Sequence, residues 1–437
     1  MKVARRFLET LQRCGPVRRS VRQELAMLFA LAAAIRFVWA CIIPPWVGPD
    51  EASHFTYVAH IVENEELPHF GPYSKDYPNH SLEVTRSCWQ TFCDRISALA
   101  APRVRELNYF PVSHDYRVAR EYLESDPEAR KSRAGSTATD YPPFYYLFAT
   151  LFYRVFSAAP VLSRLVALRV ATALLSALTA VFAYLMVFEA RRDRSLASIV
   201  GTMVALTPMS SFVGGCVNND AAMLAATGAL CWLTARYSKS EVMSIGQGAW
   251  LGGVAGLVFL TKPTGAPVVL LALAYFFLRA VFAPRGASLR ERCAGLTAFV
   301  LVLCALEGGW HWSRSLTSPT GTGGAPELGV FGVLLGRAPY SFRTYLNDLF
   351  VARGDWYFWW LFKSFWALFG WQEIALRERI YAVILVASLI GICGFIYSAA
   401  RGRFSAIELW IAVAIIGHVA GLFLARDYLL SFATSGA

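Results

Sequence analysis

The sequence predicts an all-α protein that crosses a membrane several times, and three observations support this fold class. Of the 437 residues, 56 % are hydrophobic, which is more apolar surface than a soluble chain of this length can bury. Long apolar runs recur along the chain, each able to span about 30 Å of hydrocarbon as a helix rising about 1.5 Å per residue. Arginines cluster at the ends of these runs, where basic residues set membrane topology.

Composition also excludes two other classes of protein. The chain carries 41 basic and 30 acidic residues, for a formal charge of +11. In a soluble protein this excess would suggest nucleic acid, but the position of the arginines assigns it to topology, so no nucleic-acid partner is expected. The nine cysteines form no paired CxxC pattern, which argues against a structural zinc site.

The chain begins with a basic tail, residues 1–22, which holds seven Lys and Arg residues and runs into the first apolar stretch. A cleaved signal peptide is a poor interpretation, because Arg36 interrupts the apolar core and no clean cleavage site follows. We therefore expect an uncleaved first helix with a cytosolic N-terminus.

Nine apolar runs are predicted to cross the membrane. They are 23–44, 164–189, 195–217, 220–236, 246–262, 264–282, 293–310, 379–399 and 405–425. A tenth candidate, 141–160, offers only sixteen residues between two prolines, and Arg154 interrupts them. If this segment lies on the membrane surface, every short loop on one side of the membrane is basic, as the positive-inside rule requires. We therefore predict nine spans and an interfacial helix at 141–160.

This topology places two large segments on the outer side of the membrane. The first, 46–162, is expected to carry interfacial helices. Its Cys88 and Cys93 are predicted to form a disulfide, because a loop on the outer side faces an oxidising compartment. The second, 311–375, holds a run with five tryptophans, which is typical of an aromatic belt at a membrane surface.

Three titratable residues, Asp50, Glu51 and His54, directly follow the first span. Acids in a first helical turn favour the helix dipole, so the stretch is consistent with a simple helix start. Asp50 and His54 are four residues apart and share one face of such a helix. A carboxylate above an imidazole could act as a general base or share a divalent cation, and the residues alone leave these interpretations open.

Further polar residues stand at the same predicted side of the membrane. Lys262, at the outer end of a span, could be a snorkelling lysine or could clamp a lipid phosphate. Arg164 and Arg169 allow the same two interpretations, and we predict that the three cations face one anionic pocket. Asn218 and Asp220 open a helix, where Asn218 could cap it or contact a sugar hydroxyl.

Several motifs together resemble a known family. PPWVGPDEASHF, YPPFYY, TPMSSFVGGCVNNDA, LTKPTG and SFWALFGW, between residues 25 and 377, resemble the bacterial membrane-protein family called domain of unknown function 2142. That family looks like a branch of the GT-C glycosyltransferases, which include protein mannosyltransferases and the aminoarabinose transferase acting on lipid A.

The resemblance implies a GT-C-like helical bundle over residues 23–437 in the bacterial inner membrane. It implies transfer of a sugar from a polyprenyl-phosphate donor to a glycan, lipid or protein of the cell envelope, at the extracytoplasmic face. The acidic motif falls on Asp50, as catalytic base, and on Glu51, and Lys262 is the counterpart of a lysine near the donor phosphate. The other candidate substrate-binding residues are Arg164, Arg169, Asn218, Asp220 and Tyr141. A transporter and a non-catalytic envelope-assembly protein are the alternatives.

Overall fold

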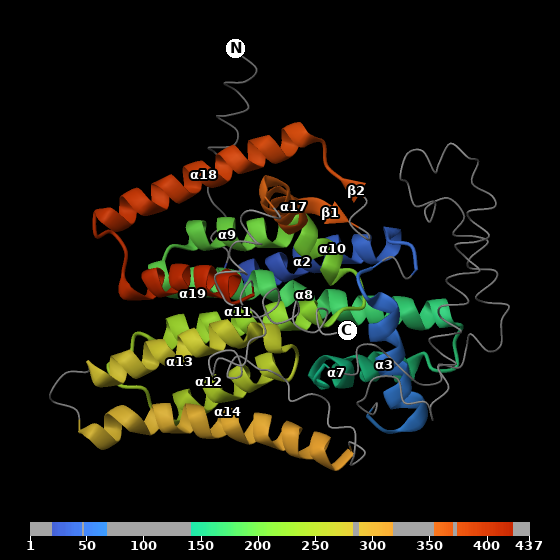
Figure 1. Cartoon of the computed structure of the whole chain (residues 1–437), viewed down its shortest axis with the longest axis horizontal. Coiled ribbons are helices and arrows are strands. Elements are labelled where there is room, and N and C mark those ends of the chain that lie inside the picture. The colour runs from blue at the N-terminus through green and yellow to red at the C-terminus, as the bar shows by residue number, and fades with distance from the viewer. Residues whose placement is uncertain are drawn as a thin grey trace.

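The computed structural model describes residues 20–45, 48–67, 141–282, 288–317, 354–369 and 374–422. Within these ranges the chain is a bundle of helices with one two-stranded sheet (Figure 1). The helices are α2 (Val21–Ile42), α3 (Glu51–Asn64), α7 (Phe144–Val155), α8 (Val161–Arg191), α9 (Arg194–Leu206), α10 (Pro208–Gly214), α11 (Asn219–Tyr237), α12 (Ile245–Phe259), η3 (Pro263–Gly265), α13 (Ala266–Val281), α14 (Leu289–Thr317), α17 (Gly354–Ala367), α18 (Glu378–Ala400) and α19 (Ala406–Leu422). The strands are β1 (Leu368–Phe369) and β2 (Ile374–Ala375), paired antiparallel.

Local sequence signals explain where several helices begin. Ser20 and Ser244 each form a capping box with the glutamine three residues later, at the starts of α2 and α12. The side chain of Asp193 caps α9, and that of Asn218 caps α11. The cap interpretation of Asn218 is therefore confirmed.

Each predicted span coincides with one helix over most of its described residues, except for 195–217, which two helices share, and the helices differ in length. Five are long and apolar enough to cross a membrane, namely α2, α8, α13 with η3, α14 and α18, among the described residues. A sixth is obtained if α9 and α10, bent by 60° at Thr207, count as one span. This bend divides the predicted run 195–217, because Pro208 lacks an N–H and cannot continue a straight helix. The count of nine crossings stays a prediction.

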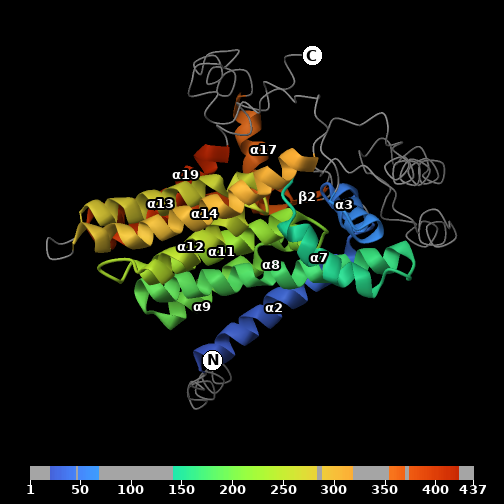
Figure 2. The ribbon, with the colours of Figure 1, turned by 90° about the horizontal axis from the view of Figure 1, so that it is seen from below.

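The segment 141–160 contains only the 12-residue helix α7, which rises roughly 18 Å and is too short for a bilayer core. α7 packs against α3 and α8. α8 is the central helix of the bundle, in contact with α2, α7, α9, α10 and α11 (Figure 2).

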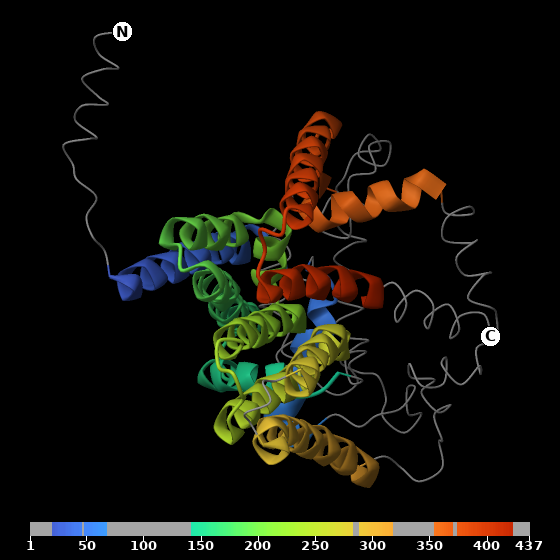
Figure 3. The same cartoon turned by 90° about the vertical axis from the view of Figure 1, so that its left-hand side faces the viewer.

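The two ends of the bundle differ in chemistry. Ion pairs gather at one end, drawn at the left of Figure 1 and facing the viewer in Figure 3. They join Arg191 to Glu408, Arg194 to Glu24 and Lys239 to Glu189. We call this the basic end. The start of α3, the start of α8 and the loop before α11 lie at the opposite end, which is where the candidate residues of the sequence motifs gather.

Candidate functional site

Four segments that are distant in sequence meet at the end of the bundle opposite the basic end. They are the start of α3, the residues before α7, the loop between α10 and α11, and the end of α12. The hydrogen bonds that join them are Phe144 N to Leu260 O (3.0 Å), Asn219 Nδ2 to Thr261 O (3.3 Å) and Asn218 Nδ2 to Pro49 O (3.2 Å). The fold thus brings the PDEASH, YPPFYY, VNND and TKPTG motifs together.

Asp50 is the exposed member of the acidic pair. It precedes α3 with φ 53° and ψ 16°, a left-handed conformation that L-residues other than Asn and Asp adopt rarely. Its side chain does not cap the helix, and no hydrogen bond or ion pair engages its carboxylate within the described ranges. Non-glycine residues with such backbones concentrate at functional sites, because the surrounding structure must hold them there.

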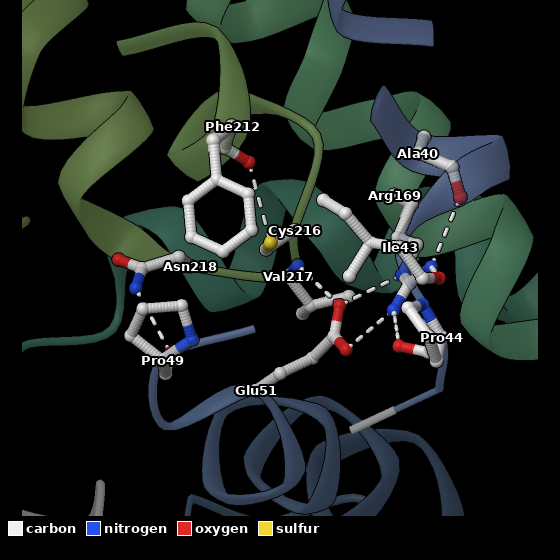
Figure 4. A network of polar contacts seen from close by, with 10 residues as sticks. All are labelled: Ala40, Ile43, Pro44, Pro49, Glu51, Arg169, Phe212, Cys216, Val217 and Asn218. Carbon is white, nitrogen blue, oxygen red and sulfur yellow. Dashed lines mark hydrogen bonds and ion pairs between the residues drawn. The ribbon is translucent and has the colours of Figure 1, made fainter. Parts of the chain in front are cut away.

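Glu51, by contrast, is completely buried, and its carboxylate lies against Arg169 (Figure 4). Its two carboxylate oxygens accept from Arg169 at 2.8 Å and 2.6 Å, and Oε1 also accepts from the backbone N–H of Val217 at 3.0 Å. Arg169 is buried as well. It donates in addition to Ala40 O (2.9 Å), Ile43 O (2.5 Å) and Pro44 O (2.9 Å). This network ties the start of α3 to α8, to the end of α2 and to the loop before α11.

His54 lies one turn further along α3 and is buried among tyrosines. Its Nδ1 is 2.8 Å from the hydroxyl of Tyr146, and its ring lies 5.9 Å from that of Tyr141. Burial, and then the charge of Lys262, lower the pKa of His54 to about 3, against a smaller opposing effect of Asp220. His54 is therefore a neutral hydrogen-bonding partner of Tyr146.

Lys262 and Asp220 form the partly exposed rim of the site. Their side chains are 15 % and 36 % exposed, and Nζ of Lys262 lies 2.6 Å from Oδ1 of Asp220. The same ammonium group is 5.1 Å from the centre of the Tyr141 ring, a cation–π distance. Stacked rings of Tyr57 and Tyr146, 3.7 Å apart, continue this aromatic wall into the interior.

The sequence model of a family described as predicted membrane protein (DUF2142) matches residues 34–431. The chain belongs to the DUF2142 family. No curated protein and no solved structure matches it. This DUF2142 chain is accordingly a membrane protein, and its several apolar helices indicate more than one crossing.

The structure corrects one expectation about the cations of this DUF2142 protein. Each has a carboxylate of its own, since Arg169 pairs with Glu51, Lys262 with Asp220, and buried Arg164 with Glu63 at 3.0 Å. The prediction that the three cations face one anionic pocket is therefore wrong. A buried guanidinium needs a compensating charge, and the fold supplies it from within the protein.

The Nδ1 of His54 is engaged by Tyr146, and no hydrogen bond within the described ranges joins His54 to the carboxylate of Asp50. A shared divalent cation gains no support, since no group of three or more His, Cys, Asp or Glu side chains in the described ranges could hold a metal ion. Asn218 is buried, and both polar atoms of its side-chain amide are engaged. Its Oδ1 accepts from Asp220 N and its Nδ2 donates to Pro49 O, which favours its role as a cap. Cys88 and Cys93 lie outside the described residues.

Sequence reasoning missed two partners in this DUF2142 chain. Glu63 accepts from both Arg164 and Tyr153, the latter at 2.7 Å, and fixes the far end of α3. Tyr146 binds His54. Glu63 lies twelve residues after Glu51 on the same helix, and only the packing of α3 against α7 and α8 reveals its partners. The repeated tyrosines of YPPFYY were a signal that could have suggested Tyr146.

Proposed function

We propose that this DUF2142 protein is an integral-membrane glycosyltransferase. It would transfer a sugar from a polyprenyl-phosphate donor to a glycan, lipid or protein acceptor of the cell envelope, at the extracytoplasmic face. The observation that carries the proposal is the exposed carboxylate of Asp50, held on a left-handed backbone beside buried, firmly paired neighbours. The resemblance of the surrounding motif to GT-C enzymes supports Asp50 as the base.

The reaction requires a proton acceptor. As the acceptor oxygen bonds to the anomeric carbon, its hydroxyl proton passes to the carboxylate of Asp50. The bond between the anomeric carbon and the phosphate oxygen breaks, and its electrons remain on the polyprenyl phosphate. An unpaired, accessible carboxylate suits this step, whereas the buried carboxylate of Glu51 is already engaged by Arg169 and Val217.

The departing phosphate requires a cation, and Lys262 is the candidate. It is half-buried, and the ring of Tyr141 helps to hold its ammonium group. The donor phosphate would replace Asp220 in its contact with Lys262, because both are anions competing for the same ammonium group. A cation held at the leaving group stabilises the negative charge that develops there.

The charges at the two ends of the bundle support one orientation of the protein. The basic end carries the arginines that the positive-inside rule assigns to the cytosol. The site lies at the opposite end, and would face the extracytoplasmic side of a bacterial inner membrane. A polyprenyl chain would remain in the bilayer while the sugar reaches Asp50 from the aqueous side.

The test is transfer by purified protein from a panel of polyprenyl-phosphate sugars, with released polyprenyl phosphate measured. Asp50→Asn should reduce the rate by at least about a hundredfold, the usual lower figure for a positioned base. Asp193→Asn is the matched control, because Asp193 caps α9 at the basic end and Asn caps equally well. A normal rate for Asp50→Asn would exclude Asp50 as the base.

One observation favours a transporter as the second candidate. The bent pair α9–α10 lies against Arg36, a completely buried residue of the apolar helix α2. Its donors reach Ser176 Oγ (2.8 Å), Ala32 O (3.1 Å), Ser210 Oγ (3.3 Å) and Ala205 O (3.4 Å). Broken helices and intramembrane charges are common at transport sites. A transporter would move a solute in proteoliposomes and lose that activity in Arg36→Gln, without any transfer of sugar.

A further inference from the structure

A second site lies at the basic end of the bundle, far from Asp50. A small hollow of about 20 Å³ opens between the loop after α11, the end of α13 and the start of α14. Figure 3 faces this end of the molecule. The hollow is lined by Glu241, Val242, Met243, Phe276, Arg279, Ala280, Arg292 and Leu296. Apolar side chains form much of the wall, and two guanidinium groups supply its positive charge.

Arg292 has one buried donor without an acceptor. Its Nε is closed off from solvent and makes no hydrogen bond, and no ion pair engages its guanidinium within the described ranges. A buried charged donor that lacks an acceptor is strongly unfavourable. An anion at the hollow would pair with this charge through the terminal nitrogens of the guanidinium, which present their donors in a fork that matches the oxygens of a phosphate.

Arg279 is fixed in position beside Arg292. Its guanidinium donates to Ser238 O and, at 2.8 Å, to Ser240 O, in the loop that follows α11. These carbonyls orient the group without neutralising its charge, and no carboxylate in the described part of the chain pairs with it. The N-terminal end of α14 adds a partial positive charge to the same region, although Glu291 in its first turn, which accepts from Ser288, offsets part of it.

The surroundings of the hollow favour a lipid as the source of the phosphate. Phe282 and Leu289, at the adjoining ends of α13 and α14, are 80 % and 70 % exposed, and Leu278 and Val281 are also exposed. In a membrane protein such side chains lie against acyl chains. Glu241 at the lining would repel a doubly charged anion more than a singly charged one, which favours a phosphodiester over inorganic phosphate.

We propose that Arg279 and Arg292 bind the phosphate of an anionic phospholipid from the membrane leaflet at the basic end. Basic pockets between helices at the cytosolic surface are suited to such headgroups. The site does not depend on the proposed catalytic activity.

The experiment measures thermal unfolding of the full-length protein in detergent, with titration of short-chain phosphatidylglycerol, phosphatidylcholine or inorganic phosphate. Phosphatidylglycerol should raise the unfolding temperature of the wild type, whereas the other two should not. In Arg292→Met the apparent dissociation constant should rise at least about tenfold, as expected for loss of a charge-assisted contact. Arg290→Met, an exposed arginine of α14 outside the lining, should behave as the wild type.

A second variant keeps the test decisive if Arg292→Met does not fold. Glu241→Gln removes the acid at the lining and should tighten binding of phosphatidylglycerol at least about threefold. An unchanged response in both variants would overturn the site. Equal stabilisation by inorganic phosphate would overturn the lipid as its occupant, and equal stabilisation by phosphatidylcholine would overturn recognition of the anionic headgroup.

Discussion

Asp50 and Glu51 are adjacent in the chain, yet one carboxylate is exposed and the other is buried against Arg169. The left-handed backbone of Asp50 produces this division, because it turns the chain sharply just before α3 begins. The same turn orients Glu51 into the interior. Only one of the two acids is therefore available to a substrate, and the other holds the first in place.

The first prediction concerns the backbone of Asp50. Asp50→Asn and Asp50→Gly should keep the unfolding temperature close to that of the wild type, because Asn and Gly accept a left-handed conformation. Asp50→Val should be less stable by at least about 1 kcal/mol, since a β-branched residue is strained there. Thermal unfolding in detergent measures the three values. Under the proposed function all three variants lose sugar transfer, and a stable Asp50→Val would contradict the backbone assignment.

The second prediction concerns the buried pair. Glu51→Gln leaves the charge of Arg169 uncompensated and should destabilise the protein by about 3–5 kcal/mol. The double variant Glu51→Gln with Arg169→Met removes that charge, and it should recover a large part of the loss. Equilibrium unfolding of the two single variants and the double variant gives the coupling between the residues.

The pair Glu63–Arg164 provides the comparison, because the side chain of Glu63 is 26 % exposed. Glu63→Gln should lower the free energy of unfolding less than Glu51→Gln does, since water can approach the remaining charge of Arg164. Equal losses in the free energy of unfolding for the two variants would mean that burial of the Glu51–Arg169 pair does not determine how much it contributes to stability.

Among the helices, the bent pair α9–α10 contains a closely packed glycine, Gly214. Gly214 at the end of α10 lies against α8 and α2, and a Cβ added to it would lie 2.4 Å from Ser176 Oγ and 3.0 Å from Arg36 Nε. Arg36 and Ser176 therefore occupy the space that a larger residue would need. The bend, the glycine and the buried arginine form one packed unit.

Gly214→Ala should consequently lower the stability by about 1–3 kcal/mol, the usual cost of overpacking. Gly391→Ala in α18 is the matched control, because a Cβ there meets nothing within 4 Å. Its stability should be unchanged or slightly higher, since alanine favours a helix. Both are measured by thermal unfolding, and similar losses in the two variants would argue against close packing at the bend.

For the molecule as a whole, the segregation of ion pairs at one end of the bundle predicts its orientation in the membrane. Single cysteines at positions 193 and 238, introduced into a cysteine-free background, both lie at the basic end. They should resist a membrane-impermeant thiol reagent in intact cells and react after the cells are lysed. Labelling of intact cells at either position would reverse the orientation and would place the Asp50 site in the cytosol.

Much of this architecture could be predicted from the order of residues. The apolar runs predicted the helices because a polar backbone in lipid must satisfy its own hydrogen bonds. The pattern DEASH predicted a helix after the first span, and α3 confirms it. Asn218 was a good candidate for a cap because a cap depends on residues close in sequence.

The three-dimensional packing alone assigned partners to the charged residues. Glu51 lies 118 residues from Arg169, and Lys262 lies 42 residues from Asp220. No local pattern specifies such pairs, because they depend on which helices become neighbours and how each is rotated. The left-handed turn at Asp50 likewise depends on contacts that stabilise an otherwise unfavourable backbone. Sequence therefore indicated which residues could carry chemistry, and packing determined that Asp50 stays accessible while Glu51, Arg164 and Arg169 hold the bundle together.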